Sequence, residues 1–237
     1  MKFENTEVWG FEHAIRGARN PMNSWDKSDS FMCYGNEKFN DCISNCDICP
    51  RKDKEDFNSD IFCIGKEDMR LMQKLIISGS EHRKFMRQIF VSVDITAPLY
   101  WWKEADTYKV GTVANSCSTM HKIHSKEFTL DDFSYNHLSD SALKILKKVI
   151  EELNKNRKLF NETKDKQYWW NMIQLLPTSY NQKRTITMNY ENLLGMCSKG
   201  QRRFHKLDEW SVDFINWART LPYAQELIFI DEVTENI

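Results

Sequence analysis

Cysteine is the residue type whose spacing is most unusual in this chain of 237 residues. Five of its seven cysteines fall between positions 33 and 63, and four of them follow the pattern Cys42-x3-Cys46-x2-Cys49-x13-Cys63. Thiolates at such spacing are the ligands of a structural zinc ion or of an iron–sulfur cluster. The pattern predicts a metal site at these four cysteines, with a loop of reduced, unconnected thiols as the alternative. Because four cysteines leave no open position on the metal, the site is expected to be structural rather than catalytic.

A second group of polar residues lies between Trp101 and His124. Residues 101–109 alternate aromatic and charged side chains too closely for one clean solvent-facing side. This stretch is either a core helix with extended lysines or part of a binding site. The stretch that follows adds hydroxyl, amide, amine and imidazole groups from Asn115, Ser116, Ser118, Thr119, His121, Lys122 and His124. A phosphorylated ligand requires donors of this kind, so the segment is a candidate phosphate site.

A third cluster, residues 201–206, is basic. Four of its residues are cationic or become so on protonation: Arg202, Arg203, His205 and Lys206. They could hold an anion near the start of the helix predicted to follow. A solvated turn between two helices explains the same residues.

The elements that must position these groups follow from hydrophobic periodicity. Helices are predicted over residues 11–19, 66–77, 81–88, 99–108, 141–158, 168–176, 190–199 and 207–220. Residues 90–95 alternate and are rich in β-branched side chains, which predicts a half-buried strand. Residues 111–118 are small and polar and predict a loop or an irregular start to a helix. We therefore expect one domain over residues 1–237, with residues 28–64 as a Cys-rich inserted segment.

Composition limits the class of protein. The chain has 41% hydrophobic residues but only 8 Gly and 5 Pro, which argues against a disordered or turn-dense all-β protein. Its 33 basic and 34 acidic residues argue against nucleic acid as a partner. No run approaches the roughly 20 apolar residues of a membrane span, and residues 1–5 lack a signal-peptide pattern. We therefore expect no membrane association and a reducing, cytoplasmic location, in which an odd number of cysteines needs no explanation.

The order of these features resembles the flavin-dependent thymidylate synthases. In that family a Gly-His turn precedes a strand that ends near proline, a helix and an Arg-His-Arg-x7-Ser-x-Arg-Tyr motif. A Leu-Pro break and two C-terminal helices carrying an arginine follow. The counterparts here are residues 79–82, the strand 90–95, Pro98, Tyr108-Lys109-Val110-x7-Ser118-Thr119-Met120-His121, Leu176-Pro177 and the helices around Arg202. The resemblance covers residues 66–220 and leaves the cysteine segment outside.

The motif itself departs from the family pattern. Tyr108-Lys109-Val110 stands where the family has the flavin-binding Arg-His-Arg, which leaves one cation instead of two or three. Met120-His121 replaces the final Arg-Tyr, whereas Asn115 and Ser118 match polar positions. Since lysine cannot reproduce the bidentate contacts of arginine, these changes bear directly on phosphate binding.

The resemblance implies an α/β (α+β) fold, helix-rich around a small, mostly antiparallel sheet, and a homotetramer whose subunits share the active sites. It implies FAD as cofactor, a uracil nucleotide as substrate, and folate and NADPH as partners. On this basis the substrate phosphate would contact Lys109, Asn115, Ser118 and Arg202. The flavin or the base would contact His82, Lys103, Tyr108 and His121.

Three functions are compatible with these residues. The first is an enzyme that modifies a pyrimidine ring carbon, with FAD relaying a hydride and a one-carbon unit. The second is a catalytically inactive nucleotide-binding or interaction protein on the same scaffold, which the loss of the Arg-His-Arg cations favours. The third is a zinc-containing nucleic-acid binder unrelated to the family, which leaves most of the chain unexplained.

Overall fold

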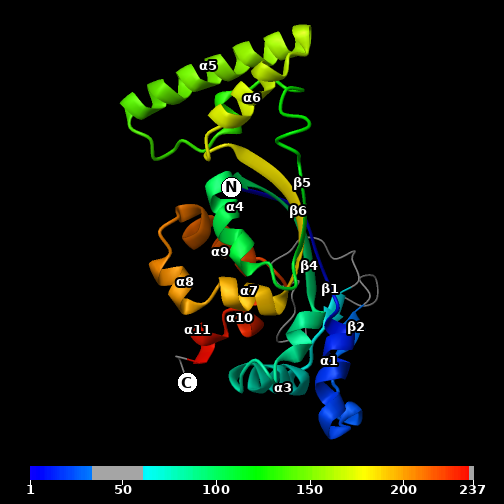
Figure 1. Ribbon diagram of the computed structural model, residues 1–237. Coiled ribbons are helices and arrows are strands. Elements are labelled where there is room, and N and C mark those ends of the chain that lie inside the picture. The colour runs from blue at the N-terminus through cyan, green and yellow to red at the C-terminus, as the bar shows by residue number, and fades with distance from the viewer. Residues whose placement is uncertain (34–60, 235–237) are drawn as a thin grey trace. The chain divides into compact units, whose positions relative to one another are not determined.

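The computed structural model describes residues 1–33 and 61–234 (Figure 1). Of the four cysteines predicted as metal ligands, Cys42, Cys46 and Cys49 lie outside the described residues, and Cys63 lies in strand β3 (Ile61–Cys63). Within the described ranges, no helix combines the length and the apolar character that crossing a membrane requires.

The main sheet of the described residues has four strands, in the order β1-β4-β6-β5. They are β1 (Lys2–Trp9), β4 (Phe90–Pro98), β5 (Val113–Ser116) and β6 (Asn181–Asn189). In β4 the side chains of Val91, Val93 and Ile95 are fully buried and the residues between them are half-buried, as the two-residue period of a strand requires. The fold is helix-rich α/β around a small antiparallel sheet, which confirms the predicted class.

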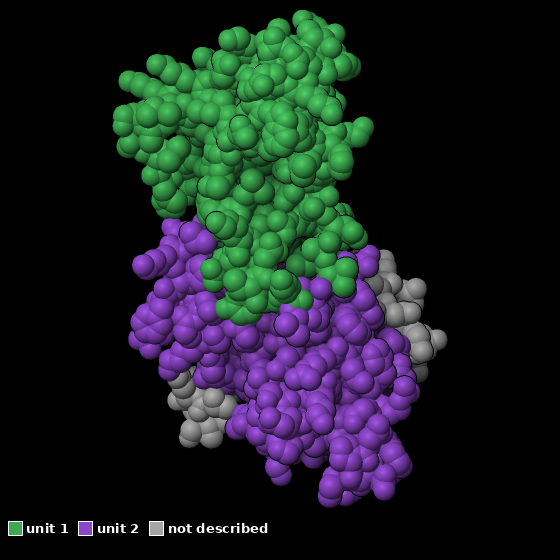
Figure 2. Space-filling model, viewed as in Figure 1, with its two compact units in different colours: residues 1–6, 93–109, 113–186 green, residues 7–92, 110–112, 187–237 purple. Residues whose placement is uncertain are grey.

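The described residues form two compact units (Figure 2). Unit 1 comprises residues 1–6, 93–109 and 113–186, and unit 2 comprises residues 7–92, 110–112 and 187–237 as far as these are described. The expected single domain with an insertion at 28–64 stays a prediction.

Unit 1 contains a long hairpin of two helices, α5 (Asp140–Thr163) and α6 (Lys166–Leu175). The other helical elements of this unit are α4 (Leu99–Ala105) and the short turns η4 (Asp106–Tyr108) and η5 (Leu130–Asp132). Helices α5 and α6 pack together through Leu146, Ile150 and Leu153 of α5 and Met172 of α6. The Ser139 hydroxyl accepts a hydrogen bond from the Ala142 N–H at 3.4 Å and so caps the start of α5.

Unit 2 holds most of the shorter helices. Its N-terminal elements are α1 (Phe11–Arg19), η1 (Asn20–Met22), η2 (Trp25–Lys27), β2 (Phe31–Cys33), β3, α3 (Lys66–Ile77) and η3 (Lys84–Gln88). Its C-terminal elements are α7 (Tyr190–Met196), α8 (Lys199–Phe204), η6 (Glu209–Phe214), α9 (Ile215–Arg219), α10 (Ala224–Leu227) and α11 (Ile230–Thr234). Trp210, Phe214 and Phe229 are fully buried among them.

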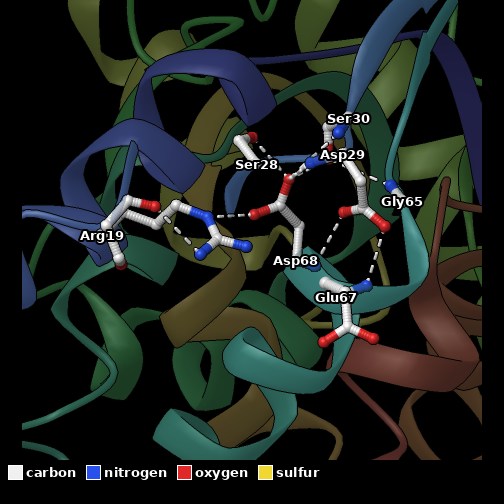
Figure 3. Close-up of polar contacts among 8 residues, drawn as sticks. Arg19, Ser28, Asp29, Ser30, Gly65, Glu67 and Asp68 are labelled. Atoms are coloured by element: carbon white, nitrogen blue, oxygen red, sulfur yellow. Dashed lines mark hydrogen bonds and ion pairs between the residues drawn. The ribbon is translucent and has the colours of Figure 1, made fainter. Parts of the chain in front are cut away.

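A buried carboxylate connects the first residues of the Cys-rich segment to helix α3, which follows that segment (Figure 3). Asp68, fully buried in the first turn of α3, accepts hydrogen bonds from Arg19 Nε at 2.6 Å and from Ser28 Oγ at 2.7 Å. Ser30 donates to it twice, from Oγ at 2.6 Å and from its backbone N–H at 3.1 Å. Residues 28–30, before β2, are thereby attached to the helix that follows β3.

Asp29 strengthens the same junction by capping α3. Its carboxylate accepts the N–H groups of Glu67 at 2.9 Å and of Asp68 at 3.0 Å (Figure 3). Strands β2 and β3 pair antiparallel beside it, with Phe31 opposite Cys63 and Cys33 opposite Ile61.

Several predicted elements differ from the structure. In the predicted helix 81–88 only η3 is helical, and the predicted loop 111–118 contains strand β5. The predicted helix 190–199 is divided into α7 and α8 at residues 197–198, and a π-helical turn, η6, precedes α9 in the predicted helix 207–220. Strands β1 and β6 were not predicted at all.

Candidate functional site

Two buried tryptophans anchor helix α4 in the core. Trp101 and Trp102 are each 1% exposed, which confirms the interpretation of this stretch as a core helix. The indole N–H of Trp102 donates to the backbone carbonyl of Gln182 in β6 at 2.9 Å. Lys103, the next residue, is exposed. The helix thus buries its two tryptophans and exposes Lys103 to solvent in its last turn.

Residues 113–121 are held along the neighbouring strand. Beyond β5, the Cys117 N–H donates to the Lys183 carbonyl at 2.9 Å, and Gln182 Nε2 donates to the Cys117 carbonyl at 2.8 Å. Ser118 Oγ then accepts the N–H groups of Met120 at 3.2 Å and His121 at 2.9 Å, which forms a tight turn. Because Ser118 Oγ accepts both bonds, its own hydroxyl proton remains available to a ligand.

The donors predicted for phosphate and cofactor are open to solvent. The side chains of Lys103, Lys109, Asn115 and His121 are exposed, and within residues 1–33 and 61–234 none of them makes a hydrogen bond or an ion pair. Tyr108 is half-buried in η4. With Tyr108 and Ser118, these four make six of the eight predicted nucleotide and cofactor residues, and all six belong to unit 1. Two amines, an amide, an imidazole and a hydroxyl suit an anionic nucleotide or the pyrophosphate of FAD.

Sequence reasoning missed Arg184, which lies on β6. Its guanidinium stacks on the Trp102 ring at 4.3 Å from the ring centroid, Nε donates to Gln182 Oε1 at 3.0 Å, and Nη1 contacts Asp106 Oδ1 at 2.9 Å. Through Gln182, this arginine joins η4 to the Cys117 turn. No local sequence signal points to it, because its partners Trp102 and Asp106 lie about eighty residues earlier in the chain.

The strand that carries Arg184 is held in register by a polar network on unit 1. Asp94 of β4 accepts hydrogen bonds from Thr185 Oγ1 at 2.6 Å, Lys183 Nζ at 3.0 Å and Asn5 Nδ2 at 3.0 Å. These hydrogen bonds lower the pKa of Asp94 to about 2. The carboxylate therefore stays ionised at any physiological pH and keeps β6 aligned with β4.

The two remaining predicted residues lie in unit 2. His82 is exposed in the turn before η3. Arg202 is 13% exposed and already paired: Nη2 contacts Asp231 at 2.9 Å, Nε contacts Glu232 at 3.2 Å, and Nη1 donates to the Cys197 carbonyl at 2.6 Å. Its guanidinium secures the C-terminal helix α11, so a ligand would have to compete with two carboxylates for it.

The predicted metal site is represented in the described residues by Cys63 alone, which is 2% exposed at the end of β3. In the described part of the chain, no group of three or more His, Cys, Asp or Glu side chains is placed to hold a metal ion.

Comparison with known proteins gives matches in structure only. No protein-family model and no curated protein matches the sequence. The flavin-dependent thymidylate synthase of Helicobacter pylori, solved with FAD and dUMP, matches with a TM-score of 0.62 at 14% identity, over 98% of this chain and 99% of that chain. A second structure of that enzyme with FAD and dUMP gives a TM-score of 0.63 at 14% identity, over 98% of both chains.

A nucleotide-modifying enzyme matches less fully. The UMP/dUMP methylase of Streptomyces cacaoi, bound to 5-Br UMP, gives a TM-score of 0.51 at 14% identity, over 70% of this chain and 83% of that chain. The match to the synthases extends well beyond the residues 66–220 on which the resemblance in sequence rests. The chain has the fold of the flavin-dependent thymidylate synthases over nearly its whole length.

Proposed function

We propose that this protein binds a uracil nucleotide together with FAD and modifies the pyrimidine ring. The observation that carries the proposal is the fold match over 98% of the chain to an enzyme solved with both ligands. The open donors of residues 103–121 support it, since Lys103, Lys109, Asn115 and His121 have no competing partner in the described parts of the chain. FAD, when bound, would supply hydride transfer and one-carbon relay.

The chain's own residues would bind and orient the nucleotide. Lys109 and the Ser118 hydroxyl would contact the phosphate, and Asn115 would donate its amide to the phosphate or sugar. Lys103, Tyr108, His121 and His82 would contact FAD or the base. Arg202 would be a further contact for the phosphate. Folate and NADPH as co-substrates, a homotetrameric assembly and a cytoplasmic location belong to the same proposal.

The first test is flavin content and nucleotide binding. Purified protein, or protein incubated with FAD, is expected to show flavin absorbance at about one flavin per chain, and dUMP is expected to raise its melting temperature. Lys109→Ala is expected to weaken dUMP binding about tenfold or more, since it removes a charge-assisted hydrogen bond. The matched control is Lys144→Ala, an exposed lysine on α5. A colourless protein that takes up neither FAD nor dUMP would contradict the proposal.

A second function, a nucleotide-binding protein without catalysis, is favoured by two observations. Tyr108-Lys109-Val110 offers one cation where the family motif has more, and Arg202 is committed to Asp231 and Glu232. This function predicts protection by dUMP without thymidylate formation from dUMP, methylene-folate and NADPH. Turnover in that mixture excludes it.

We also propose that Cys42, Cys46, Cys49 and Cys63 hold a structural zinc ion. The spacing of the cysteines supports this, as do the hydrogen bonds from Ser28 and Ser30 to Asp68, which attach the N-terminal end of the segment to α3. Wild-type protein is expected to contain about one zinc per chain, and Cys46→Ser to lose it and to melt at lower temperature. Cys117→Ser, at an exposed cysteine outside the cluster, is the control. Metal-free wild-type protein that melts like Cys46→Ser would refute the zinc site.

A further inference from the structure

Arg184 is a cation of unit 1 whose position is fixed by its neighbours and whose guanidinium is suited to bind an oxyanion such as a phosphate. Its side chain is 16% exposed, its guanidinium carbon lies over the Trp102 ring, and its Nε donates to Gln182 Oε1. The arginine is therefore held in one orientation before any ligand arrives, so little side-chain entropy remains to be lost on binding. Nη2 has no hydrogen-bond partner within residues 1–33 and 61–234, which leaves half of the guanidinium fork open.

Asp106 occupies the other half of that fork. It lies at the C-terminal end of α4, its side chain is 57% exposed, and one oxygen contacts Arg184 Nη1 at 2.9 Å. The Asp106 carboxylate has no other partner within the described ranges. An ion pair with one exposed member contributes little to stability. A dianionic phosphate, which can accept from both Nη atoms, is therefore able to displace the carboxylate.

The position of this pair matches the site proposed above. Asp106 is the first residue of η4, the turn that contains Tyr108 and ends directly before Lys109. Arg184 is also connected to the residues that follow β5. It donates to Gln182, and the Gln182 amide donates to the carbonyl of Cys117, the residue before Ser118. An anion between Arg184 and Lys109 would thus contact the stretch that carries the predicted phosphate donors.

From these contacts we infer that Arg184 binds the phosphate of the nucleotide, and that Asp106 takes the place of the phosphate when the site is empty. The inference rests on the proposed function for the identity of the nucleotide. Arg184 would supply, from β6, the bidentate contact that Lys109 cannot make. Asp106 would set the affinity, because every nucleotide that binds must first displace its carboxylate.

The experiment compares dUMP with deoxyuridine, which lacks the phosphate, by calorimetry on the full chain. Arg184→Lys is expected to weaken dUMP binding about tenfold or more, because it removes the bidentate contact, and to leave deoxyuridine binding unchanged. Asp106→Asn is expected to tighten dUMP binding several-fold, and this gain should disappear in the double variant with Arg184→Lys. Arg87→Lys and Asp131→Asn, both at exposed positions, are the matched controls.

The outcomes separate this inference from the proposed function. If Arg184→Lys is folded and binds dUMP as tightly as the wild type, the inference is overturned even when flavin binding holds. If Arg184→Lys does not fold, an Asp106→Asn variant with unchanged dUMP affinity overturns it as well. If the wild type binds neither FAD nor dUMP, the proposed function fails, and inorganic phosphate becomes the probe. Binding of phosphate to Asp106→Asn, lost in the double variant, then supports the anion site, and no such binding overturns it.

Discussion

Replacing Asp68 by alanine is expected to lower the free energy of unfolding by about 3–5 kcal/mol. The substitution leaves Arg19, itself 5% exposed, as a buried cation without its carboxylate partner. It also removes the acceptor of the Asp29 and Ser30 backbone N–H groups and of two serine hydroxyls. Buried groups that lose their partners bear the full cost of desolvation, which makes this one of the most damaging single changes available in unit 2.

Urea denaturation followed by circular dichroism measures this effect. Glu67→Ala is the matched control, because Glu67 precedes Asp68 in α3 but forms an exposed ion pair with Arg70 at 2.6 Å. That pair is expected to contribute less than about 1 kcal/mol. Equal losses in the two variants would show that the buried network adds nothing beyond an ordinary surface carboxylate.

The Asp68 network also gives a pH dependence with a defined sign. Burial acts to raise the pKa of Asp68, but hydrogen bonds from Ser30, Ser28 and Arg19 outweigh it and hold the pKa below the ordinary value of 3.8. The stabilisation is therefore complete above the pKa of the unfolded chain and is lost as pH falls through the lower folded value. In Asp68→Ala, unfolding is expected to depend less steeply on pH below about pH 4.

Replacing Trp102 by alanine is expected to cost about 3–5 kcal/mol of unfolding free energy. The side chain is 1% exposed and packs edge-on against Trp101, with ring centroids 4.9 Å apart. The substitution opens a cavity, removes the hydrogen bond to the Gln182 carbonyl and takes away the surface on which Arg184 is stacked. Stability and nucleotide binding are therefore expected to fall together.

Trp170→Ala is the comparison for this prediction, because Trp170 is 47% exposed on α6. It should lose less than about 1 kcal/mol and leave dUMP binding unchanged. Trp102→Phe keeps part of the ring volume and should fall between the wild type and Trp102→Ala. A Trp102→Ala variant as stable as Trp170→Ala would contradict the assignment of α4 as a core helix.

The helices were predictable where their signals are local. Helices α1 and α3 have the predicted bounds, because Asn20-Pro21 ends the first and Ser78-Gly79-Ser80 ends the second. Each of these signals lies within a few residues of the element that it ends.

Strand β6 was not predictable for the opposite reason. Its polar residues Gln182, Lys183 and Arg184 conceal the alternation of a strand. Their partners, among them Asp94 and Asp106, lie about eighty to ninety residues away in sequence. For the same reason the candidate phosphate segment could be located from its own residues, but the arginine beside it could not.

The pairing of β2 with β3 has a consequence for how this chain tolerates changes in length. Cys33 and Ile61 are opposite one another, so the polypeptide departs and returns at adjacent positions of one ladder. The Tyr223 hydroxyl holds the end of β3 in place: it accepts a hydrogen bond from the Ile64 N–H at 2.9 Å and donates one to the Phe62 carbonyl at 3.0 Å. The entropy of closing a loop grows only slowly with its length, by roughly 0.6 kcal/mol for each doubling. Relatives of this chain could therefore gain, trim or exchange whole modules at this point while the remainder of the fold stays intact.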